Sequence, residues 1–330
     1  MRIGIDAMGG DGAPAMCVAG AVLSRDLLAD GDRIVLVGDE SAIHEHLPAG
    51  AEWEDIIEVY HASEVISMGE SPIEALRGKP DSSMAVLAEL HKRGKVDAMI
   101  SAGNTGACVA AAQMRLRRLD AIYRPGITIL TPTYRGPVAI SDVGANVNCR
   151  PQHLQQYAIM SSEYLAGMCG IENPRVGLLS IGEEDAKGNS LVKNTRELIK
   201  DDSRINFIGN IEGRDLFSGV CDVMICEGFV GNVVLKLIEG MSIGVIQGML
   251  KEMAAAMPDQ AANIARSGKS VMGKYDFNEY GGAPLLGVAG ICIICHGASN
   301  ERGIMNAVRG AKEFSSHQIN QRIVKLVSEG

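Results

Sequence analysis

Strand-like and helix-like segments alternate along most of this 330-residue chain, and no other feature limits its possible folds as much. Short runs rich in valine, isoleucine and leucine end at glycine or polar residues, and a helical pattern follows most of them. The alternation is typical of parallel strands, because each needs a crossover connection that a helix supplies. We therefore predict an α/β fold with three α/β/α layers and a doubly wound, mainly parallel sheet. The expected strands lie at 2–10, 33–39, 56–63, 97–104, 126–132, 137–146, 175–182, 205–213, 221–228 and 288–297, and the expected helices at 72–78, 83–93, 106–119, 151–166 and 189–201.

A long helical region at 230–274 interrupts the alternation. Its first half is apolar on most faces, so we expect it to be buried or to lie at an interface. Its second half has few large apolar side chains and is basic on balance, which is typical of a protruding tip. No low-complexity linker divides the chain, so we predict a single two-lobed domain over 1–330 with a protruding helical tip at about 235–275.

The charge balance and the start of the chain restrict the class of protein. A formal net charge of −9 argues against nucleic-acid binding as the main function. Asp6 interrupts the first apolar residues, so the start does not resemble a signal peptide. No stretch approaches about eighteen uninterrupted apolar residues, so we expect no membrane-spanning helix. These features predict a cytoplasmic globular enzyme.

Cys292, Cys295 and His296 form a C-x-x-C-H run, the spacing of a c-type haem attachment site. The run ends an apolar, strand-like segment. Residues three apart on a strand point to opposite faces, so the two thiols could hardly bind one metal ion. The sequence also lacks the second C-x-x-C that a four-sulfur zinc site needs. We therefore predict buried free thiols, no metal, and a histidine at the strand end.

The first of five polar, glycine-rich turns at expected strand ends follows the first strand. Gly10, Gly12 and Ala15 fit the dinucleotide pattern G-x-G-x-x-A. Asp11 would repel a pyrophosphate at that place, and no acidic residue stands at the distance expected for a ribose contact. A turn that positions Asp6 or Asp11 explains the sequence at least as well, so we predict no cofactor.

The other four turns place hydrogen-bond donors that could bind an anion at expected strand ends. The turn at 101–107 combines glycines with Asn104 and Thr105 at a helix start, although an ordinary N-cap explains these two residues equally well. The turn at 180–195 carries a lysine, and its acidic run is expected to be a solvated loop. The turns at 141–149 and 226–236 carry asparagines. Several such turns on one sheet edge predict a site for an anionic ligand, held by neutral donors and helix ends.

Eight motifs taken in chain order carry a resemblance to a known family: IDAMGGDGAP, SAGNTGA, DVGANV, KGNSLVK, GNIEGRDLF, CEGFVGNVVLKLIEG, GGAPLLGV and HGASN. The chain resembles the bacterial phosphate acyltransferases of phospholipid synthesis, from its first residues to about Asn306. Gly12 and Glu227 depart from the pattern of the family. The family is similar in fold to phosphotransacetylase and isopropylmalate dehydrogenase, which agrees with the alternation of strands and helices.

The resemblance implies transfer of a fatty acyl group from acyl carrier protein to inorganic phosphate, which gives acyl phosphate for membrane phospholipid synthesis. Near neutral pH phosphate is largely dianionic and can attack without a dedicated base. The pantetheine thiol, with a pKa of about 8.5, leaves with little acid help. The protein must then bind phosphate beside the thioester and stabilise the oxyanion, which requires neither a metal nor a cofactor.

The resemblance and the turns together give a set of candidate site residues. The expected phosphate-binding residues are Ser101, Gly103, Asn104, Thr105, Lys187, Gly188 and Asn189. The expected catalytic residues are Asn146, Lys187, Asn232 and His296. The two asparagines would orient the acyl carbonyl, and Lys187 would bind phosphate. His296 would act as an acid for the thiolate, although a structural role is equally consistent with its place at a strand end.

Further expectations concern partners and alternatives. Acyl carrier protein is acidic, so docking needs a local basic patch, expected at Arg115, Arg117, Arg118 and Arg124, although a solvated helix face explains these arginines equally well. Glycines four apart in 230–274 predict a homodimer. The basic tip predicts peripheral attachment to the inner face of the cell membrane, although a flexible solvated loop explains the segment equally well. The resemblance further implies a downstream glycerol-3-phosphate acyltransferase as a partner. The alternative functions are a nicotinamide-dependent dehydrogenase of related fold and a non-enzymatic acyl-carrier scaffold.

Overall fold

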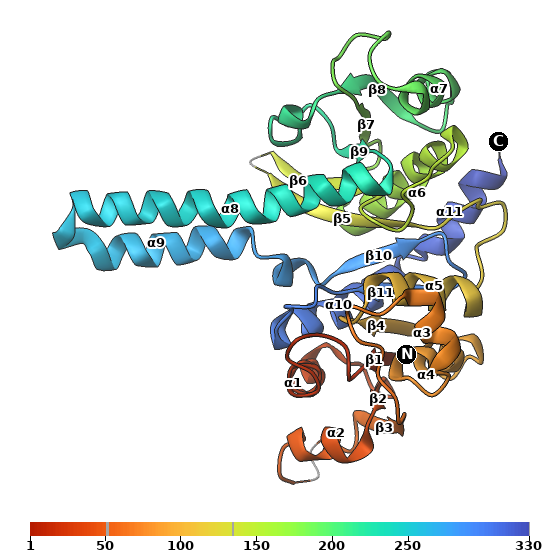
Figure 1. Cartoon of the computed structure of the whole chain (residues 1–330), viewed down its shortest axis with the longest axis vertical. Coiled ribbons are helices and arrows are strands. Elements are labelled where there is room, and N and C mark those ends of the chain that lie inside the picture. Colours follow the sequence, from red (N-terminus) through yellow and green to blue (C-terminus); the bar gives the residue numbers. More distant parts are fainter. Residues whose placement is uncertain (51–52, 134, 330) are drawn as a thin grey trace.

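An eleven-stranded mixed sheet forms the body of the protein in the computed structural model, which describes residues 1–50, 53–133 and 135–329 (Figure 1). Five parallel strands form the first strand block, and four parallel strands form the second strand block, with β10 and β5 between them. In sheet order they are β3 (Ile57–His61), β2 (Arg33–Gly38), β1 (Arg2–Asp6), β4 (Ala98–Ser101), β11 (Ile291–Ile294), β10 (Ala283–Leu286), β5 (Gly126–Thr133), β6 (Gly136–Ser141), β9 (Val223–Ile225), β7 (Arg175–Leu179) and β8 (Asn206–Ile211).

The two strand blocks run in opposite directions. β10 pairs antiparallel with β11 and with β5, and β5 pairs antiparallel with β6, so the chain direction reverses three times between the blocks. Turns that follow β1, β4 and β11 therefore lie at one edge of the sheet, and turns that follow β6, β7 and β9 lie at the other. The expectation that the polar turns share one edge is wrong, because β10, a strand that the alternation did not predict, inserts between the blocks.

Helices cover both faces of the sheet and complete the predicted three layers. One face packs against α1 (Ala15–Leu23), α6 (Pro151–Cys169), α10 (Glu301–Ser316) and α11 (Ile319–Ser328). The other packs against α3 (Pro72–Gly78), α4 (Ser83–Lys92) and α5 (Thr105–Arg115). α2 (Glu40–His46) and α7 (Ser190–Ile199) are the other helices of the body. The sequence pattern did not predict α1, α2, α10 and α11. The α/β alternation that the sequence predicts is confirmed.

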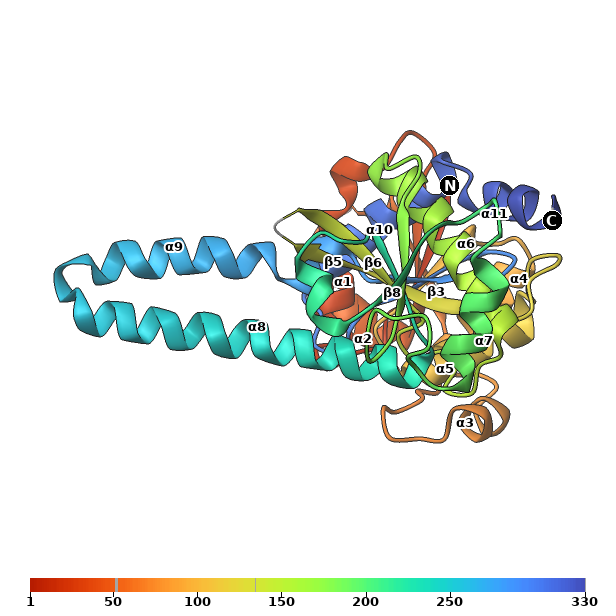
Figure 2. The ribbon, with the colours of Figure 1, turned by 90° about the horizontal axis from the view of Figure 1, so that it is seen from above.

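Two helices form a hairpin that projects from the body (Figures 1 and 2). α8 (Gly228–Ala256) leaves the sheet directly after β9, and α9 (Ala261–Lys274) returns beside it. Leu250 lies so close to Gly268 that a Cβ on that glycine would come within 2.4 Å of the leucine side chain. Close packing between the two helices therefore depends on a residue without a side chain at this position.

The first half of the helical region was expected to be buried or to lie at an interface, and it is not buried within the chain: 6% of its most apolar stretch of 18 residues is buried. Two other expectations about this hairpin are wrong. By length and composition α8 could cross a membrane, so the expectation that composition excludes such a helix is wrong. Met272 and Lys274, which belong to the segment expected to form the tip, lie instead at the base of α9, and the tip is the turn at 257–260.

The C-x-x-C-H run ends β11 as predicted, with its two thiols on opposite faces of the sheet. Cys292 packs with the α4 and α5 face, 3.7 Å from the Cys108 sulfur. Cys295 belongs to the core on the other face, and burial raises the pKa of its thiol to about 12. The separation explains why this spacing does not form a chelating pair.

Candidate active site

A cavity of about 1440 Å³ lies where the hairpin joins the sheet. Its walls come from α8 and α9, from β5, and from the turns after β1, β4 and β11. Aliphatic side chains form most of the wall near the hairpin. Asn232, Lys236 and His296 line the base together with Thr105 and Asp11. This arrangement joins a polar end, defined by these five residues, to a long apolar compartment.

The turns after β1, β4 and β11 meet at the polar end. The backbone N–H of Asp11 donates to the Gly297 carbonyl at 2.8 Å. Gly9 lies against the next turn, since a Cβ there would come within 2.7 Å of the Gly103 nitrogen. The DAMGGDGAP and HGASN motifs are thus parts of one surface, and their glycines allow the backbones to approach closely.

Asp6 and Ser101 hold the first two of these turns together. Ser101 Oγ donates to the Asp6 carboxylate at 2.7 Å and accepts the Gly103 N–H at 3.1 Å. Burial raises the pKa of Asp6, although hydrogen bonds from serine hydroxyls and a backbone N–H oppose the rise. Because these groups are buried and paired with one another, they shape the turn rather than face the cavity.

Asn104 is the N-cap of α5, as the alternative interpretation of the sequence proposed. Its carbonyl oxygen accepts the Ala107 N–H at 3.0 Å, and its amide donates to the backbone carbonyls of Ser67, Met68 and Glu70. These bonds use the polar atoms of the side chain and anchor the loop before α3. Of the four residues expected in this turn to bind phosphate, Thr105 is the one that lines the cavity.

Asn146 belongs to a buried network at the other edge of the sheet. Its amide donates to the Pro125 carbonyl at 2.7 Å, to Tyr157 Oη at 2.9 Å and to Asp142 at 3.2 Å. Burial raises the pKa of Asp142, while backbone N–H groups of the turn oppose that rise. Asn146 has its donors occupied, so its geometry favours positioning the turn over direct contact with an acyl carbonyl.

Asn232 lies in the first turn of α8, beside Gly144. Glu227 caps this helix by accepting the N–H groups of Phe229 and Val230. A Cβ at Gly231 would come within 1.9 Å of the Asp142 carbonyl, so the glycine is what lets α8 start against the second strand block. The side chain of Asn232 is exposed at the cavity wall, within reach of a ligand.

Lys236 follows Asn232 by one helical turn and meets His296 from the other side of the cavity. Lys236 Nζ lies 2.9 Å from His296 Nε2, and the Ala298 N–H donates to Nδ1 at 3.1 Å. A neutral ring that accepts at Nδ1 carries its proton on Nε2. Partial burial, then the Lys236 charge, lowers the pKa of His296 and favours this neutral form. In this tautomer Lys236 Nζ and the Nε2–H of His296 are both donors and cannot bond to each other, so an anion between them can accept from both. Lys236 Nζ also donates to Glu239 Oε2 at 2.8 Å, and an anion would have to share the ammonium with this carboxylate.

The nine residues from Gly228 to Lys236 connect the two edges of the sheet. This length of helix rises about 12 Å. The first turn of α8 contacts the Asn146 turn, since the Gly228 N–H donates to the Asn146 carbonyl at 2.8 Å, and Lys236 reaches His296. The α8 helix, rather than a shared sheet edge, brings Asn232 and His296 to one cavity.

Lys187, Gly188 and Asn189 lie on the loop after β7. Asn189 is the N-cap of α7 and accepts the Val192 N–H at 2.9 Å, as its place before a helix suggests. Lys187 is exposed, and none of the three is among the residues that line the cavity. The structure does not bring Lys187 to the polar end, so its role in phosphate binding stays a prediction.

Of the four arginines expected to bind the carrier, Arg115 is the last residue of α5, and the other three follow the helix and are exposed. Arg115 lies 3.6 Å from Glu89, which neutralises part of its charge. Arg118 donates to the Tyr123 carbonyl, and Arg124 donates to Asn146 Oδ1 at 3.4 Å. The contact of Arg124 with Asn146 places the patch beside the turn that supports the start of α8.

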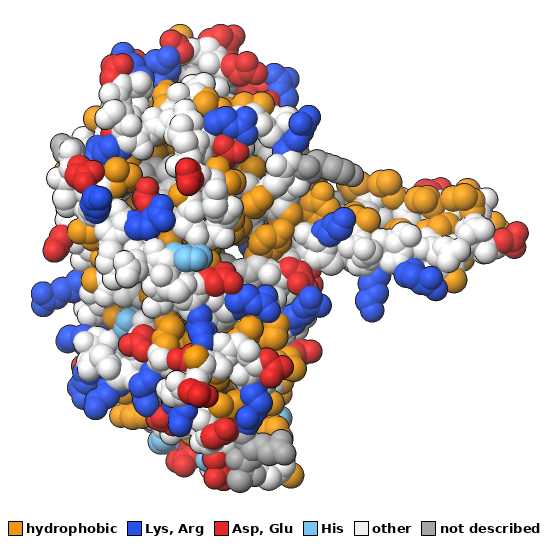
Figure 3. Space-filling view, turned by 180° about the vertical axis from the view of Figure 1, so that it is seen from behind, with side chains coloured by type: hydrophobic (Ala, Val, Ile, Leu, Met, Phe, Trp, Pro, Cys, Tyr) orange, Lys and Arg blue, Asp and Glu red, His pale blue; other side chains and the backbone are white. Residues whose placement is uncertain are grey.

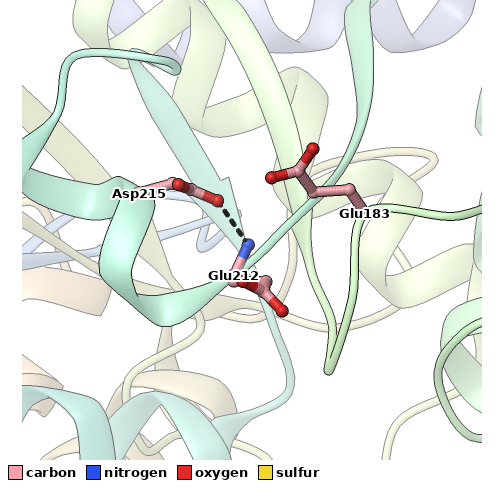
Figure 4. A group of neighbouring side chains, drawn as sticks. All are labelled: Glu183, Glu212 and Asp215. Atoms are coloured by element: carbon pink, nitrogen blue, oxygen red, sulfur yellow. Dashed lines mark hydrogen bonds between the residues drawn. The ribbon is translucent and has the colours of Figure 1, made fainter.

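Three carboxylates outside the cavity lie close enough together to consider as cation ligands. Glu183, Glu212 and Asp215 have oxygens within 4.8 Å of one another (Figure 4). Asp215 accepts the Glu212 N–H at 2.8 Å, and Arg214 pairs with Glu212 at 2.6 Å. These bonds cap a short helical turn with an arginine as counter-charge, and the cluster carries no further interpretation.

Lys236 and Asp11 were absent from the expected site, although both line the polar end. Lys236 stands four residues after Asn232, which on a helix places both on one face. That spacing could have identified Lys236, because both lie in the same motif. The contact with His296 could not have been found in this way, since the two residues are sixty positions apart.

Comparisons with known proteins identify relatives over almost the whole chain. Residues 1–322 match the family described as "Fatty acid synthesis protein". The "Phosphate acyltransferase" of Geobacter sulfurreducens is 44% identical over 98% of this chain and 94% of its own length. That of Nostoc sp. is 45% identical over 98% of this chain and 95% of its own length.

A solved structure supports the fold. A phosphotransacetylase from Streptococcus pyogenes superposes with a TM-score of 0.60 over 97% of this chain and 94% of its own, at 14% identity. At that identity the likeness shows the three-layer fold alone. The match to phosphate acyltransferases at 44% and 45% identity does not favour the alternative of a dehydrogenase. The chain therefore belongs to the fatty acid synthesis protein family and is a relative of the bacterial phosphate acyltransferases.

Proposed function

We propose that this protein transfers a fatty acyl group from acyl carrier protein to inorganic phosphate at the polar end of the cavity. The observation that carries the proposal is the meeting of Lys236 and His296, 2.9 Å apart, beside an apolar compartment. A phosphate oxygen needs converging donors, and a fatty acyl chain needs an apolar wall. Both requirements are satisfied by residues of one cavity.

The chemistry can be assigned to side chains that face the cavity. Lys236 and Thr105 hold phosphate, and the nucleophilic oxygen attacks the thioester carbon. Asn232 donates to the developing oxyanion, and Nε2–H of His296 stabilises the departing thiolate. The carbon–oxygen bond forms, the carbon–sulfur bond breaks, and the thiolate takes its proton from solvent. Lys187, Gly188 and Asn189 remain proposed additional phosphate contacts.

Ser101, Gly103, Asn104 and Asn146 act one step further from the substrate in this proposal. Their polar atoms are committed to Asp6, to the loop before α3 and to Asp142. They fix the turns that present Thr105 and the start of α8. Fixed donors stabilise a transition state better than mobile ones because they need no reorganisation during reaction.

The hairpin suggests how the enzyme is assembled and where it works. The outer side of α8 exposes Val233, Leu237, Met241 and Val245, and an apolar surface of this extent marks an interface. We assign it to a homodimer. The cytoplasmic enzyme would attach peripherally to the membrane through the tip, which would deliver acyl phosphate to a downstream acyltransferase such as that acting on glycerol 3-phosphate.

Turnover of palmitoyl acyl carrier protein tests the proposed function. With inorganic phosphate we expect free carrier and acyl phosphate in equal amounts, the latter trapped as a hydroxamate. Without phosphate, release of carrier should fall to the rate of spontaneous hydrolysis. Release that is independent of phosphate, or that requires a nicotinamide cofactor, would contradict the proposal.

A further inference from the structure

α8 has two apolar faces, and they serve different purposes. Leu235, Ile238, Ile246 and Leu250 follow one another at helical spacing and line the cavity. The outer face has its own apolar stripe, with Leu237 58% and Met241 56% exposed. Figure 3 shows apolar side chains along much of the projecting hairpin. The inner face needs an occupant of its own, because a partner on the outer face cannot cover it.

We infer that this inner face holds the acyl chain of the substrate, with Ile246 and Leu250 setting the chain length that the enzyme prefers. The inference rests on the proposed function. It follows from continuity: the apolar compartment opens directly onto Asn232, Lys236 and His296, where the thioester must lie. An acyl chain attached to that thioester can enter the compartment directly, without passing through solvent.

The dimensions fit a long chain. Lys236 and Leu250 are fourteen residues apart on α8, which is about 21 Å along the helix axis. An extended chain advances about 1.25 Å per carbon, from a bond of about 1.5 Å at a tetrahedral angle. The distance therefore accommodates about sixteen carbons, with the terminal methyl group near Leu250.

The two helices pack against each other in the far part of the compartment, whose lining continues past Leu250 to Ala254 and Ala261. Leu250 lies on Gly268, and Ile264 beside it is 7% exposed. Each methylene buried in such a compartment strengthens binding about fourfold. Affinity should therefore rise with chain length until the methyl group reaches Leu250, and rise less for longer chains, because Leu250 and Ile264 occupy the space between the helices there.

Substitution of Ile246 tests the inference with acyl carrier proteins that carry 8, 12 or 16 carbons. Ile246→Phe fills the middle of the compartment, so kcat/KM for 16 carbons should fall at least tenfold relative to that for 8 carbons. Leu250→Ala enlarges the far part of the compartment, so the chain length with the highest kcat/KM should increase. Val271→Phe is the matched control, because Val271 is exposed on α9 and does not line the cavity; its profile should equal that of the wild type.

The possible results separate the inference from the proposed function. Equal losses at all chain lengths in Ile246→Phe, with an unchanged optimum in Leu250→Ala, would overturn the acyl-chain compartment while the wild-type enzyme still turned over. A change of oligomeric mass in Ile246→Phe without a change of profile would show that a second copy occupies this face instead. Failure of the wild-type enzyme to use phosphate would reject the function itself.

Discussion

Lys236 and His296 meet across the cavity although sixty residues separate them in the chain, and their meeting defines the polar end. If Lys236 binds phosphate as a point charge, Lys236→Ala should raise the phosphate KM about tenfold, a loss of about 1.4 kcal/mol. The KM for acyl carrier protein should change little. Steady-state kinetics with each substrate varied in turn measures both values.

Lys187→Ala provides the comparison. Lys187 is exposed and lies outside the cavity, so we expect a smaller rise of the phosphate KM than for Lys236→Ala. A larger rise of the phosphate KM for Lys187→Ala than for Lys236→Ala would place the principal phosphate site at the turn after β7, as the sequence motif alone suggested.

Asn232 is the residue expected to act mainly on the transition state. Removal of an oxyanion donor costs about 3 kcal/mol, so Asn232→Ala should lower kcat about 100-fold while each KM changes less. The side chain is exposed, and the melting temperature should stay near that of the wild type. A large loss of thermal stability with normal kcat in the folded fraction would instead mean that Asn232 is structural.

The two asparagines show how far residue-level prediction can go. Both Asn146 and Asn232 follow strands in amide-rich turns, and the sequence treats them alike. The structure separates them because Pro125 and Tyr157, distant in sequence from one another, occupy the Asn146 amide. A motif can identify the type of donor, but it cannot tell which donor the tertiary structure leaves available.

At the level of elements, the spacing of apolar residues predicted most of the strands, and the five helices expected from it are all present. β10 was missed because the GGAPLLGV segment contains only four strand residues, Ala283–Leu286, one of them a proline. This short strand reverses the direction of half the sheet. A local error of one element therefore changed the expected position of three turns.

The glycines of α8 make a prediction about assembly. Gly240, Gly244 and Gly248 lie four apart, and a Cβ on any of them would have no neighbour within 4 Å among the residues that the structure describes. Gly244→Leu should therefore not disturb the isolated chain, and its better helix propensity should favour α8 by up to about 1 kcal/mol. If these glycines allow a second copy to approach, the substitution should convert dimer to monomer in light scattering.

Gly78→Leu is the control, because Gly78 ends α3 and a Cβ there would also have no neighbour within 4 Å in the described part of the chain. Its mass in solution should equal that of the wild type. A Gly244→Leu protein that remained a dimer would place the contact surface elsewhere on the molecule.

At the scale of the molecule, the enzyme has a net charge of −9 and must still attract an acidic carrier. The exposed arginines after α5 give a local positive surface beside the start of α8. Arg117→Glu should raise the KM for acyl carrier protein several-fold and weaken its dependence on salt, because rim charges act mainly on encounter. Lys325→Glu, an exposed reversal on α11, should change neither quantity. Equal effects of the two reversals would show that only net charge matters.

The hairpin carries its tip far from the body, since the 29 residues of α8 span about 43 Å. Met253 and Met257 are exposed near the tip, and Lys251 precedes them, whereas Glu252 and Asp259 share the same surface. The mixed charge means that shallow insertion of the methionines should dominate, with anionic lipid adding a smaller contribution. Met257→Glu should therefore abolish flotation with vesicles of phosphatidylglycerol. Lys251→Glu should weaken it, and its difference from the wild type should shrink in high salt, which screens the charge. Lys274→Glu, at the base of α9, should float like the wild type. Recovery of the wild-type protein in the bottom fraction, with and without vesicles, would leave the hairpin as a dimerisation and acyl-binding element alone.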